Sequence, residues 1–184
     1  MSQSRGESVS VLILPAGPAD AEELARVHVR AWRETYRGLL PDAYLARMSE
    51  AAFTRRFRRA LTQPGPNDVT LVAASRDGLV GYAEGGPSRA GVPDEAEIAT
   101  LYLLRQAQGL RLGRRLLTAA ARALAAQGAK SLAISVLRDN IRARGFYERL
   151  GGAAEPATME RGPGGALLHE VVYRWPEIGR LLEP

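Results

Sequence analysis

The sequence predicts an α/β (α+β) fold, in which helices cover both faces of a mixed sheet. Some segments have apolar residues every three to four positions, as helices do, and others alternate apolar and polar residues or are short apolar runs, as strands do. The predicted order is strand, helices, three strands, helix, strand, helix and one or two final strands. The chain contains no internal repeat and no linker long enough to separate two domains. We therefore expect one domain over residues 1–184.

The first third of the chain is predicted to hold one strand and three helices. Apolar and polar residues alternate loosely over Val9–Leu14, which is predicted to be a strand that Pro15 ends. Asp20, followed by Glu23 three residues later, has the pattern of a capping box at the start of a helix. Two further helices are expected, from Asp42 to Met48 and from Ser49 or Glu50 to Leu61.

The middle of the chain is predicted to hold three strands. Val69–Ala74 and Leu79–Gly85 are short apolar runs, and the Asp77-Gly78 pair between them is a strong hairpin signal. After a loop over 86–94, Ala96–Leu104 is expected to be the next strand. This strand leads directly into the most informative segment of the sequence.

The last third alternates helices and strands. Arg111–Gln127 has its leucines and alanines on one side of a long amphipathic helix, and Gly128 is well placed to end it. Ser131–Leu137 is predicted to be a strand, and a helix is expected from about Asn140 to Leu150. Ala166–Trp175 is predicted to be the last strand, and Pro176 follows it.

The composition excludes several kinds of site and location. The chain has no cysteine, so disulfides, thiolate nucleophiles and cysteine metal sites are excluded. Its two histidines, His28 and His169, are far apart in the sequence; no metal is expected, and both are interpreted as structural or exposed. There is no apolar run of membrane-spanning length and no secretory signal pattern, which predicts a cytoplasmic protein without membrane contact.

The net charge of +5 permits an anionic partner. Nearly all the basic residues are arginines, since Lys130 is the only lysine. A nucleic acid and a phosphorylated cofactor both fit such a charge, although an arginine- and alanine-rich composition alone also accounts for it. The sequence contains no recognition helix and no aromatic RNA-binding motif, so we expect no specific nucleic-acid partner.

The segment from Leu101 to Gly113 is a candidate phosphate-binding turn. A strand ends there and a helix begins, and a helix N-terminus offers unpaired N–H groups and the positive end of the helix dipole to a phosphate. Gly109 and Gly113 allow close backbone approach. The segment has neither the Gly-Lys-Ser/Thr of a Walker A loop nor the three glycines of a dinucleotide fingerprint. An ordinary strand-to-helix connection is the alternative.

Two motifs in this order resemble those of the GNAT superfamily of N-acetyltransferases, bacterial type. Gln108–Gly113 resembles the acyl-CoA-binding signature Gln/Arg-x-x-Gly/Ala-x-Gly/Ala, except that Arg111 stands where Gly or Ala is usual. Asn140–Gly151 resembles the family motif Asn-x-x-Ala-x-x-Phe-Tyr-x-x-Leu-Gly, at the right spacing from the first. A softer match is Trp32–Pro41, which is similar to the N-terminal helical region of many members.

The resemblance implies a mostly antiparallel central sheet and direct acetyl transfer from acetyl-CoA to a primary amine. Tyr147 matches the family position that protonates the CoA sulfur, and Phe146 is expected to be the core member of this aromatic pair. Asn140 is expected to contact the cofactor, to cap its helix, or both. The resemblance assigns cofactor binding to Leu101, Tyr102, Leu103, Gln108, Gly109, Leu110, Arg111, Leu112, Gly113, Arg114, Asn140 and Tyr147.

The general base is expected among the carboxylates of the predicted strands. Glu97, at the start of the strand that leads into the cofactor loop, is the first candidate, and Glu84 on the preceding strand is the second. For each, a solvated strand-end carboxylate is the alternative. Ser135 stands where protein N-terminal acetyltransferases of the RimI type often carry a glutamate, which argues against that subclass.

The sequence does not identify the acceptor, and a small-molecule or a protein amine would fit. The N-terminal helices and the loop over 86–95, which carry specificity in the family, show no clear charge code. A homodimer is common in the family. An acyl-CoA-binding regulatory module without catalysis is the alternative function, and Arg111 favours it.

Overall fold

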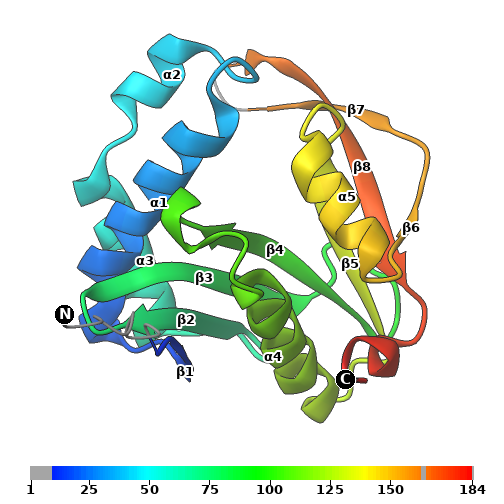
Figure 1. Ribbon diagram of the computed structural model, residues 1–184. Coiled ribbons are helices and arrows are strands. Elements are labelled where there is room, and N and C mark those ends of the chain that lie inside the picture. The colour runs from blue at the N-terminus through cyan, green and yellow to red at the C-terminus, as the bar shows by residue number, and fades with distance from the viewer. Residues whose placement is uncertain (1–9, 163–164, 184) are drawn as a thin grey trace, which may run out of the picture.

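The computed structural model describes residues 10–162 and 165–183 and contains one eight-stranded sheet within them. The strand order is β1-β2-β3-β4-β5-β8-β6, and β7 pairs with β8 (Figure 1). Only β4 and β5 are parallel; the other pairs are antiparallel, which confirms a mixed, mostly antiparallel sheet. The strands are β1 Leu12–Pro15, β2 Val69–Ser75, β3 Gly78–Pro87, β4 Glu95–Leu103, β5 Ser131–Leu137, β6 Ala153–Ala154, β7 Thr158–Arg161 and β8 Leu167–Trp175.

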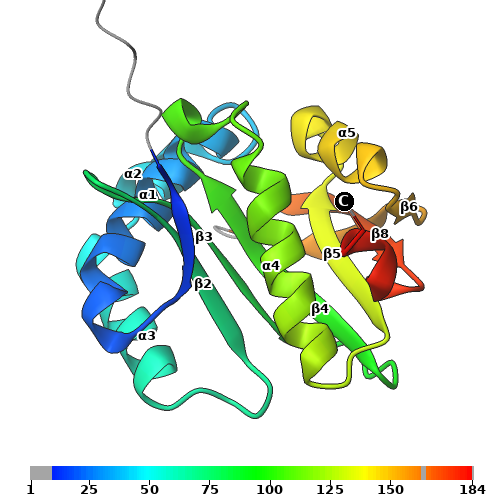
Figure 2. The same ribbon diagram turned by 60° about the horizontal axis from the view of Figure 1, so that its bottom comes forward.

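Helices cover both faces of the sheet, as predicted. On one face, α1 and α3 bury Leu24 and Phe57 against Val72 and Tyr82. On the other face, α4 and α5 pack against the sheet (Figure 2), and their apolar side chains join one large cluster with those of β2, β4, β5 and β8. The helices are α1 Ala21–Tyr36, α2 Asp42–Arg47, α3 Glu50–Thr62, α4 Leu112–Ala126 and α5 Ile141–Arg149.

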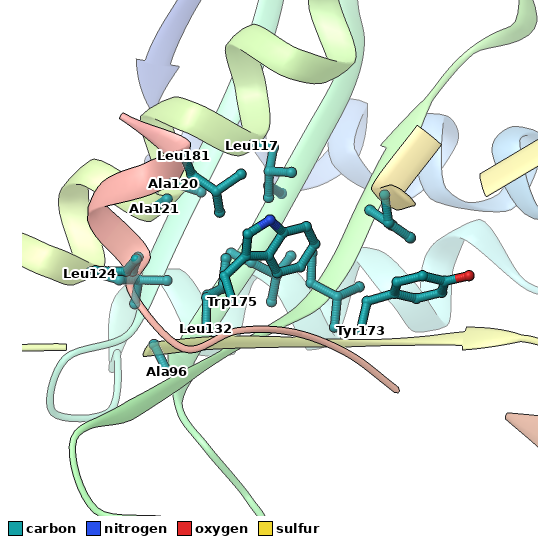
Figure 3. Close-up of a cluster of buried hydrophobic side chains, with 14 of the residues drawn as sticks. Ala96, Leu117, Ala120, Ala121, Leu124, Leu132, Tyr173, Trp175 and Leu181 are labelled. Carbon is teal, nitrogen blue, oxygen red and sulfur yellow. The ribbon is translucent and has the colours of Figure 1, made fainter. Parts of the chain in front are cut away.

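Trp175, at the end of β8, lies at the centre of the larger cluster. It is 1% exposed and is surrounded by leucines and alanines of α4, β4, β5 and the C-terminal turn (Figure 3). Its indole N–H donates a hydrogen bond of 2.7 Å to the carbonyl of Leu150, directly after α5. This side chain therefore joins α5 to the sheet and to α4.

Local sequence signals located most elements within a few residues. Ser49 caps α3 by accepting from the Ala52 N–H, and Gly128, with φ of 103°, follows the last turn of α4. Ser75 pairs with Gly78 at the predicted Asp77-Gly78 hairpin. The final region holds β6 and β7 in addition to β8, because the segment after α5 folds back onto both ends of β8.

Two predictions near the N-terminus need correction. Strand β1 extends one residue past Leu14 and ends at Pro15, which still pairs with Leu71, because an edge strand tolerates a residue without an N–H. Val9, the predicted start of this strand, lies outside the described residues. Asp20 precedes α1 but makes no capping box with Glu23; its carboxylate instead accepts from the Gly17 N–H at 2.8 Å, across the preceding 3-10 turn.

The parallel ladder between β4 and β5 is short, and the two strands then separate. Only 95–97 of β4 pair with 131–133 of β5. Beyond Glu97 the strands diverge (Figure 1), and no other described strand pairs with that edge of β4. On its other edge β4 has a bulge, because Glu84 pairs with Thr100 and Gly85 with Ile98, which leaves Ala99 as an extra residue. We call the gap beyond Glu97 the β4–β5 opening.

Neither a membrane-spanning helix nor a cluster of metal ligands occurs in the described part of the chain. None of the helices in 10–162 and 165–183 combines the length and the apolar composition needed to span a bilayer. Within the same residues, no three histidine or carboxylate side chains gather as metal ligands would.

Candidate active site

A short loop joins β4 to α4 at the wide end of the β4–β5 opening. The Gln108 side chain folds back and donates a hydrogen bond of 2.9 Å to the carbonyl of Leu103, which holds the loop against the end of β4. Gly109 has φ of 82°, a conformation that glycine adopts without steric cost, and a Cβ there would meet no atom within 4 Å. The backbone of the loop is therefore open to a ligand.

The first turn of α4 presents main-chain donors beside this opening. Arg111 is the N-cap, and its carbonyl accepts the N–H of Arg115, so the N–H groups of residues 112–114 have no partner within the helix. These donors coincide with the positive end of the helix dipole and attract an anion such as phosphate. The strand-to-helix turn lies where the sequence places it, and its binding of a phosphate stays a prediction.

Arg111 adopts the left-handed conformation, with φ of 59° and ψ of 6°. This explains why glycine suits the corresponding position of the signature motif, since only glycine enters this region without crowding its Cβ. The Arg111 side chain is exposed. The backbone of the turn thus keeps its shape although an arginine replaces the usual small residue.

We expect Arg111→Gly to raise the stability of the protein slightly. Relief of the left-handed arginine is worth about 1–2 kcal/mol, and the greater freedom of glycine in the unfolded chain offsets roughly 0.5–1 kcal/mol of this. Differential scanning calorimetry should show a higher melting temperature, by about 1–4 °C. Arg114→Gly, within α4, is the matched control and should lower it. A decrease with Arg111→Gly as large as the control's would contradict this conformation.

The arginines that follow the turn have structural partners. Arg115 donates to the carbonyl of Val11 at 2.7 Å, and Arg114 donates to the carbonyl of Glu183 at 3.3 Å. Both guanidinium groups therefore contact the backbone of distant segments, at Val11 just before β1 and at Glu183. Positive charge close to the loop comes from the backbone amides and from Arg111.

Helix α5 places Asn140 and Tyr147 on the β5 side of the opening. The Asn140 side chain accepts the N–H of Ala143 at 3.2 Å, which confirms that it caps α5. Tyr147 is 5% exposed and its ring packs against those of Tyr173 and Trp175. The expectation that Phe146 is the core member of the pair was wrong, because Phe146 is only half-buried, where it packs over Gly113 of α4.

The Tyr147 hydroxyl makes no hydrogen bond to the described residues. Burial raises the pKa of Tyr147 well above its usual value, and the nearby Tyr36 hydroxyl adds to the increase. The group therefore keeps its proton at neutral pH. A buried phenol with a free hydroxyl is able to donate a hydrogen bond to an anion that forms beside it.

Two more tyrosines approach Tyr147 from the α1 side of the sheet. Tyr36 ends α1 and Tyr102 belongs to β4, and their hydroxyls are 2.7 Å apart. Burial raises the pKa of Tyr102 well above its usual value, with further contributions from Tyr36 and Tyr147. The three hydroxyls thus lie close enough to influence one another. Tyr147 belongs to α5 and Tyr36 to α1, and these helices cover opposite faces of the sheet.

The two carboxylates predicted as bases are both in ion pairs. Glu97 accepts from the side chain and the main-chain N–H of Arg89, and this guanidinium holds the pKa of Glu97 below the usual glutamate value. Glu84 accepts from Arg56 at 3.1 and 3.3 Å. Neither arginine was recognised from the sequence, because the pairs join residues 8 and 28 positions apart.

The histidines behave as predicted. His28 is 5% exposed between α1 and α3, and its Nδ1 lies 2.5 Å from the Tyr82 hydroxyl. Burial, with a smaller contribution from Arg56, lowers the pKa of His28 to about 3, so the ring is neutral at physiological pH. His169 is exposed on β8.

Sequence reasoning missed Tyr36 and Glu170. Glu170 lies on β8 on the same face as Leu168, which packs against residues of α1 and α2, among them Tyr36. Its charge contributes to raised pKa values of Tyr36 and Arg89. A charged residue at an inward-facing position of an alternating strand was the signal that could have revealed it.

A surface pocket of about 480 Å³ adjoins the loop on another side. It is lined by residues of the loop and of the start of α4, Leu110 and Leu112 among them, and otherwise by residues of α1, α3, the β2–β3 hairpin and the segment just before β1. Neither Asn140 nor Tyr147 lines it. This pocket is therefore separate from the β4–β5 opening.

Known proteins share both the sequence pattern and the fold. YuaI, an uncharacterized N-acetyltransferase of Bacillus subtilis, is 28% identical over 176 residues, which are 93% of this chain and 96% of that protein. The structure of PaiA N-acetyltransferase from Thermoplasma acidophilum in complex with coenzyme A matches with a TM-score of 0.66 and 20% identity, over 90% of this chain and 99% of that one. The structure of yncA from Salmonella typhimurium with its cofactor acetyl-CoA matches with a TM-score of 0.69 and 17% identity, over 91% and 94%.

The family model described as the acetyltransferase (GNAT) family matches residues 28–152, from the middle of α1 to the end of α5. This range contains the loop, the β4–β5 opening, Asn140 and Tyr147. Because the match extends over more than half of the 184 residues, the chain belongs to the acetyltransferase (GNAT) family.

Proposed function

We propose that the protein transfers an acetyl group from acetyl-CoA to a primary amine by direct attack of the amine on the thioester. The observation that carries this proposal is the β4–β5 opening, which begins where strand pairing stops, at Glu97 and Ala133. The N-terminus of α4 lies on one side of this opening and Tyr147 on the other. An unpaired strand edge, an anion-binding turn and a protonated phenol are the groups that a thioester cofactor requires.

The described residues fit a CoA molecule along this opening. The free edge of β4 at Leu101–Leu103 offers main-chain groups to an amide-containing chain such as pantetheine. The amides from Gly109 to Arg114 would receive the pyrophosphate, with Arg111 near them. Gln108 shapes the loop through its bond to Leu103, and Asn140 orders the start of α5. Gln108 and Asn140 would therefore support CoA binding by fixing the backbone on either side of the cofactor.

Acetyl-CoA would supply the activated acetyl group and a thiolate leaving group. The amine nitrogen forms a bond to the carbonyl carbon while the carbon–sulfur bond breaks, the nitrogen loses one proton, and the sulfur gains one. We assign the second proton transfer to the Tyr147 hydroxyl. Burial would raise the pKa of the CoA thiol as it raises that of the Tyr147 phenol, so the phenol would still be able to give its proton to the thiolate.

Glu97 stays the first candidate for the general base and Glu84 the second. Glu97 is ionised at neutral pH, because Arg89 lowers its pKa, and would therefore act through a water and as a weak base. Comparing the pH–rate profiles of Glu97→Gln and Glu84→Gln distinguishes the two: loss of the acidic limb in one variant alone identifies the base.

The acceptor is proposed to be a small-molecule or a protein amine, and the enzyme to act in the cytoplasm as a homodimer. The experiment that tests the proposed function is a titration of the purified protein with acetyl-CoA, followed by an assay of CoA release with a panel of primary amines. Binding with amine-dependent CoA release supports the proposal. Binding without release from any amine would favour an acyl-CoA-binding module without catalysis.

A further inference from the structure

The hydroxyls of Tyr36 and Tyr102 form a pair on the α1 side of the β4–β5 opening. They are 2.7 Å apart, and the rings meet edge to face with centroids 6.2 Å apart. In such a pair one hydroxyl donates to the other, so one proton and the remaining oxygen lone pairs are available to a ligand. Burial raises the pKa of Tyr36, an effect that the bond to Tyr102 opposes and the charge of Glu170 reinforces.

This pair faces the proposed position of the sulfur from the other side of the sheet. Tyr147 belongs to α5, on the α4 side, whereas Tyr36 belongs to α1. The two phenols influence each other through the opening, because β4 and β5 are not paired beyond Glu97. An acceptor that approaches from the α1 side would thus meet Tyr36 and Tyr102 first and the thioester directly behind them.

A carboxylate and aromatic rings border the pair. Glu170 lies opposite Leu137 of β5, on the sheet face that packs against α1 and α2. The Trp32 ring lies 4.9 Å from that of Tyr36, and its buried Nε1 has no hydrogen-bond partner among the described residues. A carboxylate favours a nearby cation electrostatically, and aromatic faces add cation–π attraction. The combination suits an ammonium group.

Resting on the proposed function, we propose that Tyr36, Tyr102 and Glu170 form the acceptor subsite and that this subsite selects amines that arrive as ammonium ions. The Glu170 carboxylate holds the cation near the opening. The hydroxyl pair accepts an N–H hydrogen bond and directs the nitrogen toward the thioester. Before attack the ammonium ion releases one proton to solvent water, because only the neutral amine has the lone pair that forms the new bond. The nitrogen loses its second proton to the general base as the carbon–sulfur bond breaks, and the sulfur takes its proton from Tyr147.

The test compares Tyr36→Phe and Glu170→Gln with two matched controls. Tyr44→Phe removes a hydroxyl from a tyrosine that also packs on Trp32, and Glu177→Gln removes an exposed carboxylate far from the opening. Each protein is assayed with benzylamine, which is an ammonium ion at pH 7.5, with aniline, which is neutral, and with glycinamide. The acetyl-CoA affinity of each protein is measured by calorimetry in parallel.

The wild-type protein should prefer benzylamine to aniline. Tyr36→Phe and Glu170→Gln should each raise the KM of the best amine about tenfold or more, as expected for loss of a hydrogen bond or ion pair to a charged group. Glu170→Gln should also reduce the preference for benzylamine. The affinity for acetyl-CoA should stay within twofold, and the controls should behave as the wild type.

Three further variants distinguish loss of the subsite from a simple folding defect. Tyr102→Phe should repeat the effect of Tyr36→Phe, and the double variant should be no worse than either single one, because both remove the same pair. Glu170→Asp should recover part of the affinity that Glu170→Gln loses. If the wild type acetylates amines and the KM values of all these variants are unchanged, the subsite is wrong and the proposed function stands. If the wild type acetylates no amine, the proposed function fails and the subsite fails with it.

Discussion

Tyr147→Phe is expected to lower kcat about 100-fold or more while leaving the affinity for acetyl-CoA nearly unchanged. General acid catalysis contributes typically about 10²–10⁴ to a rate, and the phenylalanine retains the ring while it loses the hydroxyl proton that we assign to the sulfur. The ring contacts with Tyr173 and Trp175 remain, and the lost hydroxyl has no hydrogen-bond partner among the described residues. The substitution should therefore not destabilise the fold.

The matched control for this prediction is Tyr173→Phe. The Tyr173 ring packs against that of Tyr147 with centroids 5.6 Å apart, but its hydroxyl donates to Glu148 at 2.6 Å, outside the opening. Steady-state kinetics should show a kcat close to that of the wild type. Calorimetry with acetyl-CoA should give similar affinities for all three proteins. A kcat of Tyr147→Phe within twofold of the control would remove Tyr147 from the chemical step.

Trp175→Ala is expected to lower the free energy of unfolding by about 3–5 kcal/mol. The side chain is 1% exposed, and its removal leaves a cavity among the leucines and alanines shown in Figure 3. The variant also loses the hydrogen bond to the Leu150 carbonyl. Because that bond fixes the end of α5, the position of Tyr147 should become less defined, and kcat should fall together with stability.

Chemical denaturation measures this loss directly. Leu167→Ala, on the same strand, is the control: Leu167 is 63% exposed, so its truncation should change the free energy of unfolding by less than about 0.5 kcal/mol. Trp175→Phe should lie between the two, since it keeps part of the buried ring and loses the hydrogen bond. An unfolding free energy of Trp175→Ala equal to that of the control would contradict the packing of β8 against α4 and α5.

The elements that the sequence predicts well depend on local signals. Helix α4 follows from its spacing of leucines and from Gly128 after its last turn, and α5 follows from Asn140 at its start. The Asp77-Gly78 pair marks a hairpin that needs no distant partner. The loop before α4 was recognised by its motif, although the left-handed backbone at Arg111 explains that motif only once the structure is known.

The features that the sequence does not predict arise from contacts between distant segments. The β4–β5 opening depends on where pairing stops, at Glu97 and Ala133, and pairing is decided by the packing of whole strands. Tyr147 is buried more deeply than Phe146 because Tyr173 and Trp175 of a later strand cover it. The approach of Tyr36 to Tyr102 joins residues 66 positions apart.

Other expectations concern properties that the fold of one chain does not determine. The single domain over residues 1–184, the cytoplasmic location, the homodimer and the roles of the site residues stay predictions. The structure adds to them a physical arrangement, in which the N-terminus of α4 and Tyr147 lie on one side of the sheet and the Tyr36–Tyr102 pair lies on the other. The α1 side is thus expected to receive the acceptor.

The most direct test of the central claim is a calorimetric titration of the purified protein with acetyl-CoA, with CoA and ATP as comparison ligands. We expect saturable one-to-one binding of acetyl-CoA and CoA, and much weaker binding of ATP, which lacks the pantetheine that would pair with the edge of β4. Absence of binding at millimolar acetyl-CoA would contradict a cofactor site at the β4–β5 opening.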